Sequence, residues 1–184
     1  DLVEAIKHSC DVYFYKVGEM LGMTRLAEYG HLFGFAERTG VELRERVGRV
    51  PTKDWHAEHT TLGWQPGLTL STAIGQGSLT ATPLQVARAY GAVANGGYLL
   101  DVKLVRRVTD SEGDVIRQAV PRIRSKLEVA PETLSLVREG FVRVVNDIDG
   151  SAYDSALEAI VMAGKTGTAE AAQVRAGATA ELAQ

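Results

Sequence analysis

Residues Ala73–Gly97 read AIGQGSLTATPLQVARAYGAVANGG, and they contain the clearest local signals in the 184-residue chain. Thr82 stands before Pro83, and Gln85 follows Thr82 by three positions. A threonine N-cap, a proline at the first helical position and a glutamine at the third together form a capping box. The stretch therefore predicts a helix that begins at Pro83 and ends at the Asn95-Gly96-Gly97 turn. We expect its apolar residues at helical spacing to be buried: Leu84, Ala87, Gly91 and Ala94.

The segment around the start of this helix carries no charge. Residues 60–87 contain no Asp, Glu, Lys or Arg, yet glycines and prolines interrupt them too often for a membrane helix. A charge-free segment rich in glycine, serine and threonine predicts buried backbone near the floor of a pocket. Between residues 39 and 67 the helical periodicity disappears, which predicts a long ordered loop.

The beginning of the chain is predicted to be helical. Apolar residues recur at helical spacing from residue 1 to residue 35, and the pattern breaks near Ser9 and again at Gly22. Asp11 is suited to be the N-cap of the second helix, because its carboxylate can accept hydrogen bonds from the first free N–H groups.

The second half of the chain mixes strand and helix patterns. Residues 98–120 alternate in polarity around a turn at 110–113 and predict a β-hairpin. Pro131 opens an amphipathic helix. Residues 160–169 predict a buried strand, and residues 171–184 lack a clear period and predict a mobile tail.

The composition excludes several classes of protein. With 45% hydrophobic and 23% charged residues, the chain is globular and not disordered. Its 20 Lys+Arg and 23 Asp+Glu give a formal net charge of −3, so we expect no nucleic-acid surface. No apolar run approaches the roughly 20 residues of a membrane span, and no targeting segment opens the chain. The single cysteine, Cys10, leaves the redox compartment open.

Two short motifs carry side chains suited to chemistry. Lys165-Thr166-Gly167-Thr168 offers a cation, two hydroxyls and a glycine that lets a ligand approach the backbone, which suits carboxylate binding. Taken alone, such a run more often marks an exposed strand end. Ser9-Cys10-Asp11 lies at a helix junction, where Ser9 alone is best explained as a polar linker. The functional alternative requires Ser9 to face a cleft as a proton relay.

Together, these motifs resemble the second and third parts of the signature of penicillin-binding proteins and class A β-lactamases: Ser-x-x-Lys, then Ser-x-Asn, then Lys-Thr-Gly. Ala73–Gly97 is similar to the long motif of class B penicillin-binding protein transpeptidase domains. Further pieces match in order: Tyr13-Phe14-Tyr15, Trp64–Gly67, Gly150-Ser151-Ala152 and Ala163–Glu170. The similarity spans residues 1 to about 170 and is greatest to the elongation-type subgroup, penicillin-binding protein 2.

The resemblance implies an α+β fold. It is the penicillin-binding protein/serine β-lactamase-like transpeptidase fold, a five-stranded antiparallel sheet flanked by helices, of which this chain is expected to be an inner section. We expect residues 1–184 to form one partial transpeptidase domain. Its parts are a helical part at 1–97, the hairpin at 98–120, a helix and active-site strand within 131–170, and the mobile tail at 171–184.

The resemblance also implies an activity and the residues that carry it. The function would be that of a D,D-transpeptidase that cross-links peptidoglycan through a serine acyl-enzyme and binds β-lactams. Ser9, Asp11 and Lys165 would be catalytic, with Ser9 relaying a proton. Three consecutive residues would bind the substrate carboxylate and supply an oxyanion-hole N–H: Thr166, Gly167 and Thr168.

The implied partners are the peptidoglycan stem pentapeptide, β-lactam antibiotics, a glycan polymerase and elongation-complex proteins. No cofactor, metal or nucleic acid is implied. The expected location is the periplasmic side of the bacterial cytoplasmic membrane, with membrane contact only through an N-terminal anchor outside this chain.

The sequence departs from the family pattern in three respects. No serine is followed by lysine at the third position, so we expect the nucleophile and its lysine upstream of Asp1. The chain ends soon after Glu170, before the family's last strands. Asp11 stands where the family usually has asparagine. We therefore expect the chain alone to be inactive and poorly folded.

Three alternatives compete with this interpretation. A β-lactam sensor or a serine β-lactamase relative would share Ser9 and Lys165, although the Ala73–Gly97 motif argues against both. A catalytically silent binding module would explain the missing nucleophile. Four ligand-type residues within six positions suggest a metal site, but an irregular polar loop explains them better: Asp54, His56, Glu58 and His59.

Overall fold

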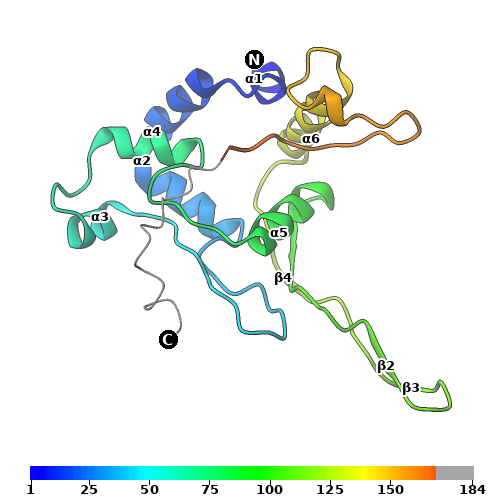
Figure 1. Ribbon diagram of the computed structural model, residues 1–184. Helices are drawn as coiled ribbons and strands as arrows, with labels where there is room; N and C mark the ends of the chain where they lie inside the picture. Colours follow the sequence, from blue (N-terminus) through cyan, green and yellow to red (C-terminus); the bar gives the residue numbers. More distant parts are fainter. Residues whose placement is uncertain (169–184) are drawn as a thin grey trace, which may run out of the picture.

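The computed structural model describes residues 1–168, which form a helical body and a long two-stranded arm (Figure 1). The helices of the body are α1 (Leu2–Lys7), α2 (Asp11–Leu32), α3 (Lys53–His59), α4 (Pro66–Ala73), α5 (Pro83–Ala94) and α6 (Pro131–Asn146), followed by the 3-10 helix η1 (Tyr153–Ser155). The strands are β1 (Tyr98–Leu100), β2 (Arg107–Thr109), β3 (Val115–Gln118) and β4 (Ile123–Lys126). The predicted mobile tail at 171–184 lies outside the described residues.

Helices α1 and α2 are separated by a tight turn near Ser9, as the sequence predicts. The predicted break at Gly22 is confirmed as a kink within α2, where Gly22 has φ 74° and ψ 164°. The prediction that Asp11 caps α2 is wrong, because Cys10 is the N-cap and Asp11 is the first helical residue. The reason is the turn itself, which is completed one residue earlier than the sequence pattern indicates.

The predicted long loop at 39–67 contains a short helix, α3, and the start of α4. Thr52 caps α3, since its Oγ1 accepts a hydrogen bond from the Trp55 N–H at 3.0 Å. Trp55 packs locally: the Arg49 guanidinium lies 4.2 Å from its ring centroid, and His59 stacks on it. The loop prediction failed because a helix of seven residues spans too few turns to show a period.

Helix α4 packs closely against α2. A Cβ atom on Gly18 would lie only 2.5 Å from the Cβ of Ala73, so glycine permits this approach. Most residues of the charge-free segment are exposed or half-buried, so the prediction of a buried segment is wrong. The predicted position beside a pocket is confirmed, because Ala73, Ile74 and Gln76 line a cavity.

Helix α5 begins with the predicted capping box. The Gln85 N–H donates to Thr82 Oγ1 at 3.2 Å, and the Thr82 N–H donates to Gln85 Oε1 at 2.9 Å. The predicted buried face is wrong, since Leu84 is half-buried and three residues are exposed: Ala87, Gly91 and Ala94. The residues that α5 buries are Gln85, Arg88, Ala89, Ala92 and Val93.

The buried face of α5 is partly polar because it holds the loop at 37–47 in place. Gln85 Nε2 donates to the carbonyls of Glu37 and Val47 at 2.8 and 2.7 Å. Arg88 donates to the Arg38 carbonyl at 3.0 Å and to the Glu37 carboxylate. Buried polar groups require such partners, and hydrophobic spacing alone does not reveal them.

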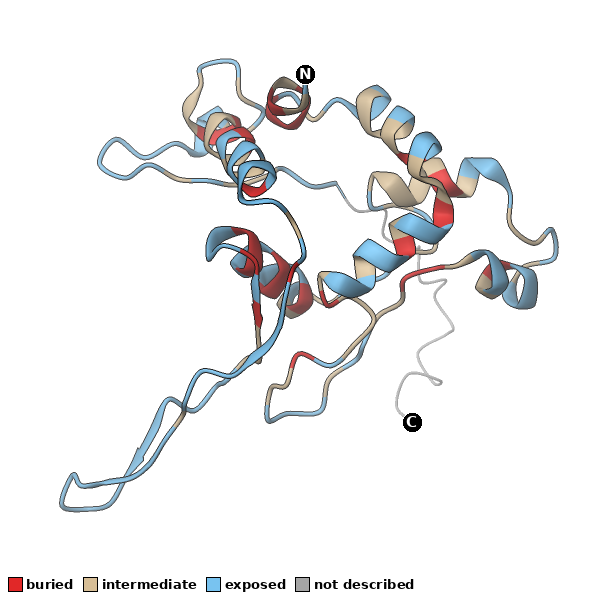
Figure 2. Cartoon of the chain, turned by 180° about the vertical axis from the view of Figure 1, so that it is seen from behind, coloured by how far each residue is buried: buried red, intermediate tan, exposed pale blue. Residues whose placement is uncertain are grey.

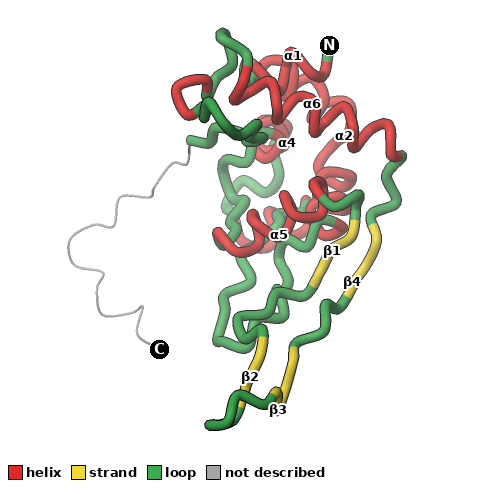
Figure 3. The backbone as a smooth tube through the Cα atoms, turned by 90° about the vertical axis from the view of Figure 1, so that its right-hand side faces the viewer, coloured by secondary structure: helices red, strands yellow, loops and turns green. Residues whose placement is uncertain are grey.

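The arm is an antiparallel hairpin that projects away from the helices (Figures 1 and 3). In β2 and β3, Val108 lies opposite Arg117, and in β1 and β4, Leu99 lies opposite Ser125. The predicted hairpin is therefore present, but its pairing continues to Lys126, beyond the predicted end at 120. Strands β2 to β4 are exposed, whereas Leu99 is buried at the base of the arm (Figure 2).

The described residues form two separate two-stranded sheets, so the five-stranded sheet is not present in them. The prediction of a buried strand at 160–169 is wrong for residues 161–168, which are exposed or half-buried and have no ladder partner among residues 1–168. The Gly164 N–H instead donates to the Phe141 carbonyl of α6 at 3.0 Å. A strand requires a neighbouring strand, and an apolar run in the sequence does not supply one.

Helices α1 and α6 pack together in a small apolar core. Ile6, Val144 and Val145 are its buried residues, and Phe141 packs against them. A Cβ atom on Gly140 would lie 2.9 Å from Ile6 Cβ, so the two helices are nearly in backbone contact. The predicted amphipathic helix after Pro131 is confirmed. Among residues 1–168, no helix combines the length and the hydropathy that a membrane span requires.

Candidate active site

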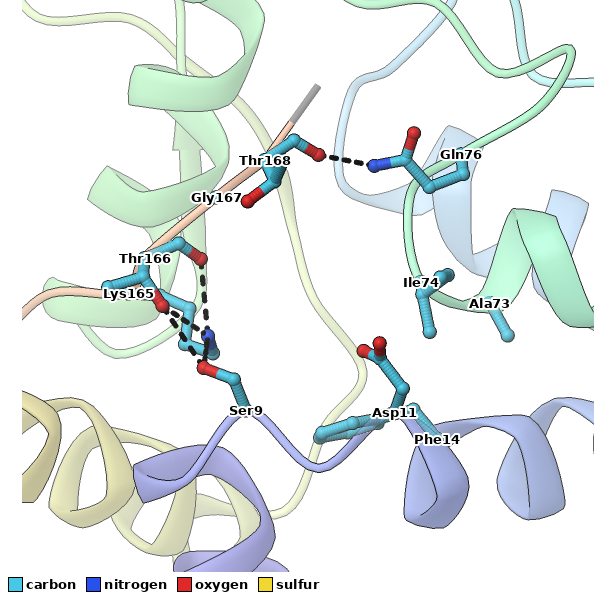
Figure 4. Close-up of a pocket in the computed structure, with 10 residues that line it drawn as sticks. All are labelled: Ser9, Asp11, Phe14, Ala73, Ile74, Gln76, Lys165, Thr166, Gly167 and Thr168. Atoms are coloured by element: carbon cyan, nitrogen blue, oxygen red, sulfur yellow. Dashed lines mark hydrogen bonds between the residues drawn. The ribbon is translucent and has the colours of Figure 1, made fainter. Parts of the chain in front are cut away.

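A cavity of about 410 Å³ opens between the α1–α2 turn, the end of α4 and residues 164–168 (Figure 4). All six candidate residues predicted from the sequence line this one cavity. Its wall comes from three parts of the chain: Ser9, Asp11 and Phe14; Ala73, Ile74 and Gln76; and Lys165, Thr166, Gly167 and Thr168. The fold therefore brings together two motifs that lie 156 positions apart.

Ser9 has a strained backbone that turns its side chain toward this cavity. Its φ of 53° lies in the left-handed region, which costs a non-glycine residue about 1–2 kcal/mol. The turn is held by two backbone hydrogen bonds, from the Ser9 N–H to the Ile6 carbonyl at 3.2 Å and from the Cys10 N–H to the Ala5 carbonyl at 2.9 Å. Strained residues of this kind cluster at functional sites.

The Lys165 amine is the centre of the polar contacts in the cavity. It donates a hydrogen bond to Ser9 Oγ and lies 3.1 Å from both the carbonyl oxygen and Oγ1 of Thr166. Ser9 Oγ and Thr166 Oγ1 are 3.0 Å apart. The lysine therefore orients two hydroxyls that face the same space (Figure 4).

The charge state of Lys165 is set by two opposing effects. Partial burial lowers the pKa of its amine from the ordinary value, because a charged group loses hydration there. The Asp11 carboxylate raises the pKa of the same amine, but it offsets only part of the effect of burial. Asp11 thus helps Lys165 to keep its positive charge.

The end of the Lys-Thr-Gly-Thr segment is held from the opposite wall. Gln76 Nε2 donates a hydrogen bond to the Thr168 carbonyl (Figure 4). At Gly167, an added Cβ would meet no described atom within 4 Å, so the backbone is open to a ligand from the cavity. Gln76 was not among the predicted site residues, because nothing in its local sequence indicates a contact 92 positions away.

Ser151 is a second residue that the sequence prediction missed. Its Oγ lies 3.1 Å from Ser9 Oγ and 3.3 Å from Thr166 Oγ1, so three hydroxyls are within hydrogen-bonding distance of one another. The Gly150-Ser151-Ala152 run matched the family pattern, but the match itself assigns no role. Only the fold reveals that Ser151 lies beside Ser9.

The position of Ser151 is fixed by contacts between α1 and the turn after α6. The Ser151 N–H donates to the Lys7 carbonyl at 3.1 Å. The buried Lys7 amine lies 3.0 Å from a Glu4 carboxylate oxygen and 3.1 Å from an Asp149 carboxylate oxygen. Hydrogen bonds from Lys7 lower the pKa of both carboxyl groups and raise the pKa of Lys7, so all three groups are charged at neutral pH.

The cluster of possible metal ligands at 54–59 does not converge in the structure. The described residues contain no group of three or more His, Cys, Asp or Glu side chains placed to hold a metal ion. His56 is buried in α3, and His59 stacks on Trp55 instead. Trp64 donates a hydrogen bond to Thr69 Oγ1 at 3.2 Å, which gives this tryptophan a packing role as well.

A Lys-Thr-Gly-Thr segment facing a serine at a helix junction defines a class, the proteins that recognise penicillin through a serine and lysine cleft. Comparison with known protein families makes the assignment specific. The chain belongs to the penicillin binding protein transpeptidase domain family, whose model matches residues 1–183. The family resemblance noted in the sequence is thereby confirmed.

Individual relatives agree with this assignment. The chain is 35% identical over 177 residues to peptidoglycan D,D-transpeptidase MrdA of Haemophilus influenzae, covering 92% of this chain and 26% of that protein. It matches penicillin-binding protein 2 of Helicobacter pylori, solved in complex with MreC, with a TM-score of 0.78 and 36% identity, over 93% of this chain and 31% of the other.

A chain of a solved peptidoglycan synthase complex gives a TM-score of 0.79 at 36% identity, over 95% of this chain and 29% of that one. These neighbours show that the chain has a penicillin-binding protein fold. The chain spans between a quarter and a third of the length of these three proteins.

Proposed function

We propose that this chain supplies one side of the active site of a serine-type peptidoglycan D,D-transpeptidase that also binds β-lactams. The observation that carries the proposal is the hydrogen bond from Lys165 to Ser9 in a cavity that also contains the Lys-Thr-Gly-Thr backbone. Because none of the 184 residues begins a Ser-x-x-Lys motif, the acylated serine and its lysine are proposed to lie in residues outside this chain.

The proposed reaction has two acyl-transfer steps. The serine oxygen attacks the carbonyl carbon of the penultimate D-alanine of a stem peptide, and a serine–acyl bond forms as the bond to the terminal D-alanine breaks. The attacking serine gives its proton to its partner lysine outside the chain, which passes it to Ser9 as Ser9 delivers its own proton to the leaving nitrogen. The amine of a second stem then attacks the acyl-enzyme, forms the cross-link and returns the proton to the serine.

The residues of the Lys-Thr-Gly-Thr segment are proposed to bind the substrate. The Lys165 ammonium and the hydroxyls of Thr166 and Thr168 suit the carboxylate of the terminal D-alanine or of a β-lactam. The Thr168 N–H is proposed as one of two oxyanion donors, each worth roughly 3–4 kcal/mol in the transition state of well-studied hydrolases. The open approach at Gly167 supports this placement.

We further propose how the chain fits into a complete domain. Residues 161–168 lack a strand partner within residues 1–168, which supports their insertion into a five-stranded sheet completed by residues outside the chain. One related protein was solved with MreC and another in a peptidoglycan synthase complex. By analogy, we propose elongation-complex proteins and a glycan polymerase as partners, on the periplasmic side of the membrane.

Replacing Ser9 by alanine tests the relay role. In the complete protein, Ser9→Ala is expected to slow acylation by labelled penicillin about 100-fold, the lower end of the range for loss of a general acid–base group. The fold should survive, because Ser9 is only half-buried and alanine meets the same backbone strain. An unchanged acylation rate with an unchanged melting temperature would return Ser9 to a linker role.

Replacing Asp11 by asparagine tests the charge of Lys165. Removal of the carboxylate that raises the Lys165 pKa leaves the effect of burial unopposed, so this pKa falls further. The amine then loses its proton at a lower pH, and the alkaline limb of the acylation rate should move to lower pH. Rates measured across pH 6–10 check this shift, with Asp154→Asn in η1 as the control. A limb that stays in place or moves upward contradicts the assignment.

A further inference from the structure

We propose that Ser151 is a positioning residue for Ser9: its hydroxyl occupies an acceptor site of Ser9 Oγ, so that the single Ser9 proton is directed toward Thr166 and the cleft. The inference rests on the proton-relay role proposed above for Ser9. Ser151 is not among the residues proposed to bind the substrate carboxylate. The inference explains why a third hydroxyl lies beside those of Ser9 and Thr166.

The hydroxyl groups of Ser9, Ser151 and Thr166 form a closed triangle. Their oxygen–oxygen distances are 3.1 Å for Ser9 and Ser151, 3.0 Å for Ser9 and Thr166, and 3.3 Å for Ser151 and Thr166. Each distance permits a hydrogen bond, and the three residues come from the α1–α2 turn, the turn after α6 and the Lys-Thr-Gly-Thr segment. The direction of the Ser9 proton therefore depends on all three of these segments together.

The donor and acceptor capacities of these groups limit the arrangement. A hydroxyl has one proton to donate and two lone pairs to accept with. Lys165 Nζ donates to Ser9 Oγ and thus occupies one lone pair. If the Ser151 hydroxyl donates to the second lone pair, Ser9 is saturated as an acceptor, and its own proton is free only for Thr166 Oγ1 or for a ligand atom in the cavity.

Ser151 is well placed for this role because it is fixed independently of Ser9. Its N–H donates to the Lys7 carbonyl, and the Ala152 N–H donates to the Val144 carbonyl at 2.9 Å. The buried Lys7 amine contacts a carboxylate in each of the two segments, Glu4 in α1 and Asp149 in the turn after α6. These contacts between α1 and the turn therefore hold Ser151 beside Ser9.

The test is a double-mutant cycle on the rate of acylation by labelled penicillin in the complete protein. Ser151→Ala is expected to slow acylation about 3- to 10-fold, the range for loss of one neutral hydrogen bond. Ser151→Thr keeps the hydroxyl at an exposed position and should retain nearly the full rate. Ser155→Ala removes a hydroxyl from η1, outside the cavity, and should leave the rate unchanged.

The background of Ser9→Ala separates positioning from general damage. If Ser151 acts through Ser9, Ser151→Ala should cause no further loss in that background. An equal loss with and without Ser9, or no loss in the presence of Ser9, would overturn the proposal. If Ser9→Ala alone leaves acylation unchanged, the relay fails first, and that result is visible without any Ser151 variant. Should Ser151→Ala not fold, Ser151→Cys, with a weaker donor of similar size, takes its place and must show the same dependence on Ser9.

Discussion

Acylation of the complete protein by labelled penicillin is expected to fall about 1,000-fold when Lys165 is replaced by alanine. Two losses combine in this variant. The cation proposed to pair with the ligand carboxylate disappears, and charge-assisted hydrogen bonds are roughly twice as strong as neutral ones. The amine that contacts both Ser9 and Thr166 also disappears, which should disturb the proposed relay. Because each tenfold change corresponds to about 1.4 kcal/mol, the combined effect of about 4 kcal/mol is within the range of two such interactions.

Two other lysine variants make this result specific. Lys165→Arg keeps a positive charge, but a planar guanidinium replaces the compact ammonium group. This variant should therefore recover only part of the rate. Lys53→Ala removes a lysine of α3, outside the cavity, whose amine lies 4.3 Å from the centroid of the Trp64 ring. This variant should react normally. Equal labelling of Lys165→Ala and the unmodified protein would show that the carboxylate is bound elsewhere.

The second large effect is expected from Gly150→Ala, which should destabilise the contacts between α1 and the turn after α6. A Cβ atom at this position would lie 2.4 Å from the Val144 carbonyl oxygen and 2.5 Å from the Arg143 carbonyl oxygen. Both are backbone atoms at the end of α6, so the turn itself must move. Overpacking of this kind typically costs about 1–3 kcal/mol. We expect a lower melting temperature together with slower acylation, since Ser151 moves with the turn.

Gly91→Ala provides the matched comparison for this glycine. Gly91 lies on the exposed side of α5, where an added Cβ meets no described atom within 4 Å. Alanine is favoured over glycine inside a helix by about 1 kcal/mol, so this variant should be as stable as the unmodified protein or slightly more stable. Thermal unfolding followed by circular dichroism compares the two. A normal melting temperature for Gly150→Ala would contradict the close contact in the turn.

Much of the local structure could be predicted because it depends on neighbouring residues alone. The capping box at Thr82 and Gln85, the kink at Gly22 and the helix after Pro131 all follow from contacts within a few positions. The buried face of α5 could not be predicted, because Gln85 and Arg88 donate hydrogen bonds to three carbonyls and one carboxylate that lie 38 to 51 positions away. Residues 160–169 were predicted to form a buried strand, but whether a strand forms depends on a partner strand.

The same division applies to the candidate site. Ser9 and Lys165 were identified by motifs, and the motifs were informative because residue type and order are visible in a sequence. The left-handed backbone conformation of Ser9 is not visible in the sequence, since it arises from hydrogen bonds to the end of α1. Ser151 and Gln76 were missed for a related reason. Each is an ordinary polar residue in its own segment and acquires a role only through a distant contact.

The conformation of Ser9 implies a conflict between thermodynamic stability and activity at this position. Glycine adopts a φ of 53° without steric penalty, so Ser9→Gly would relieve the strain while it deletes the hydroxyl. A screen that selects only for heat resistance should therefore favour glycine here, and a screen that selects for cross-linking should reject it. Under the relay role proposed for Ser9, the less stable turn is the cost of placing a hydroxyl at the cleft.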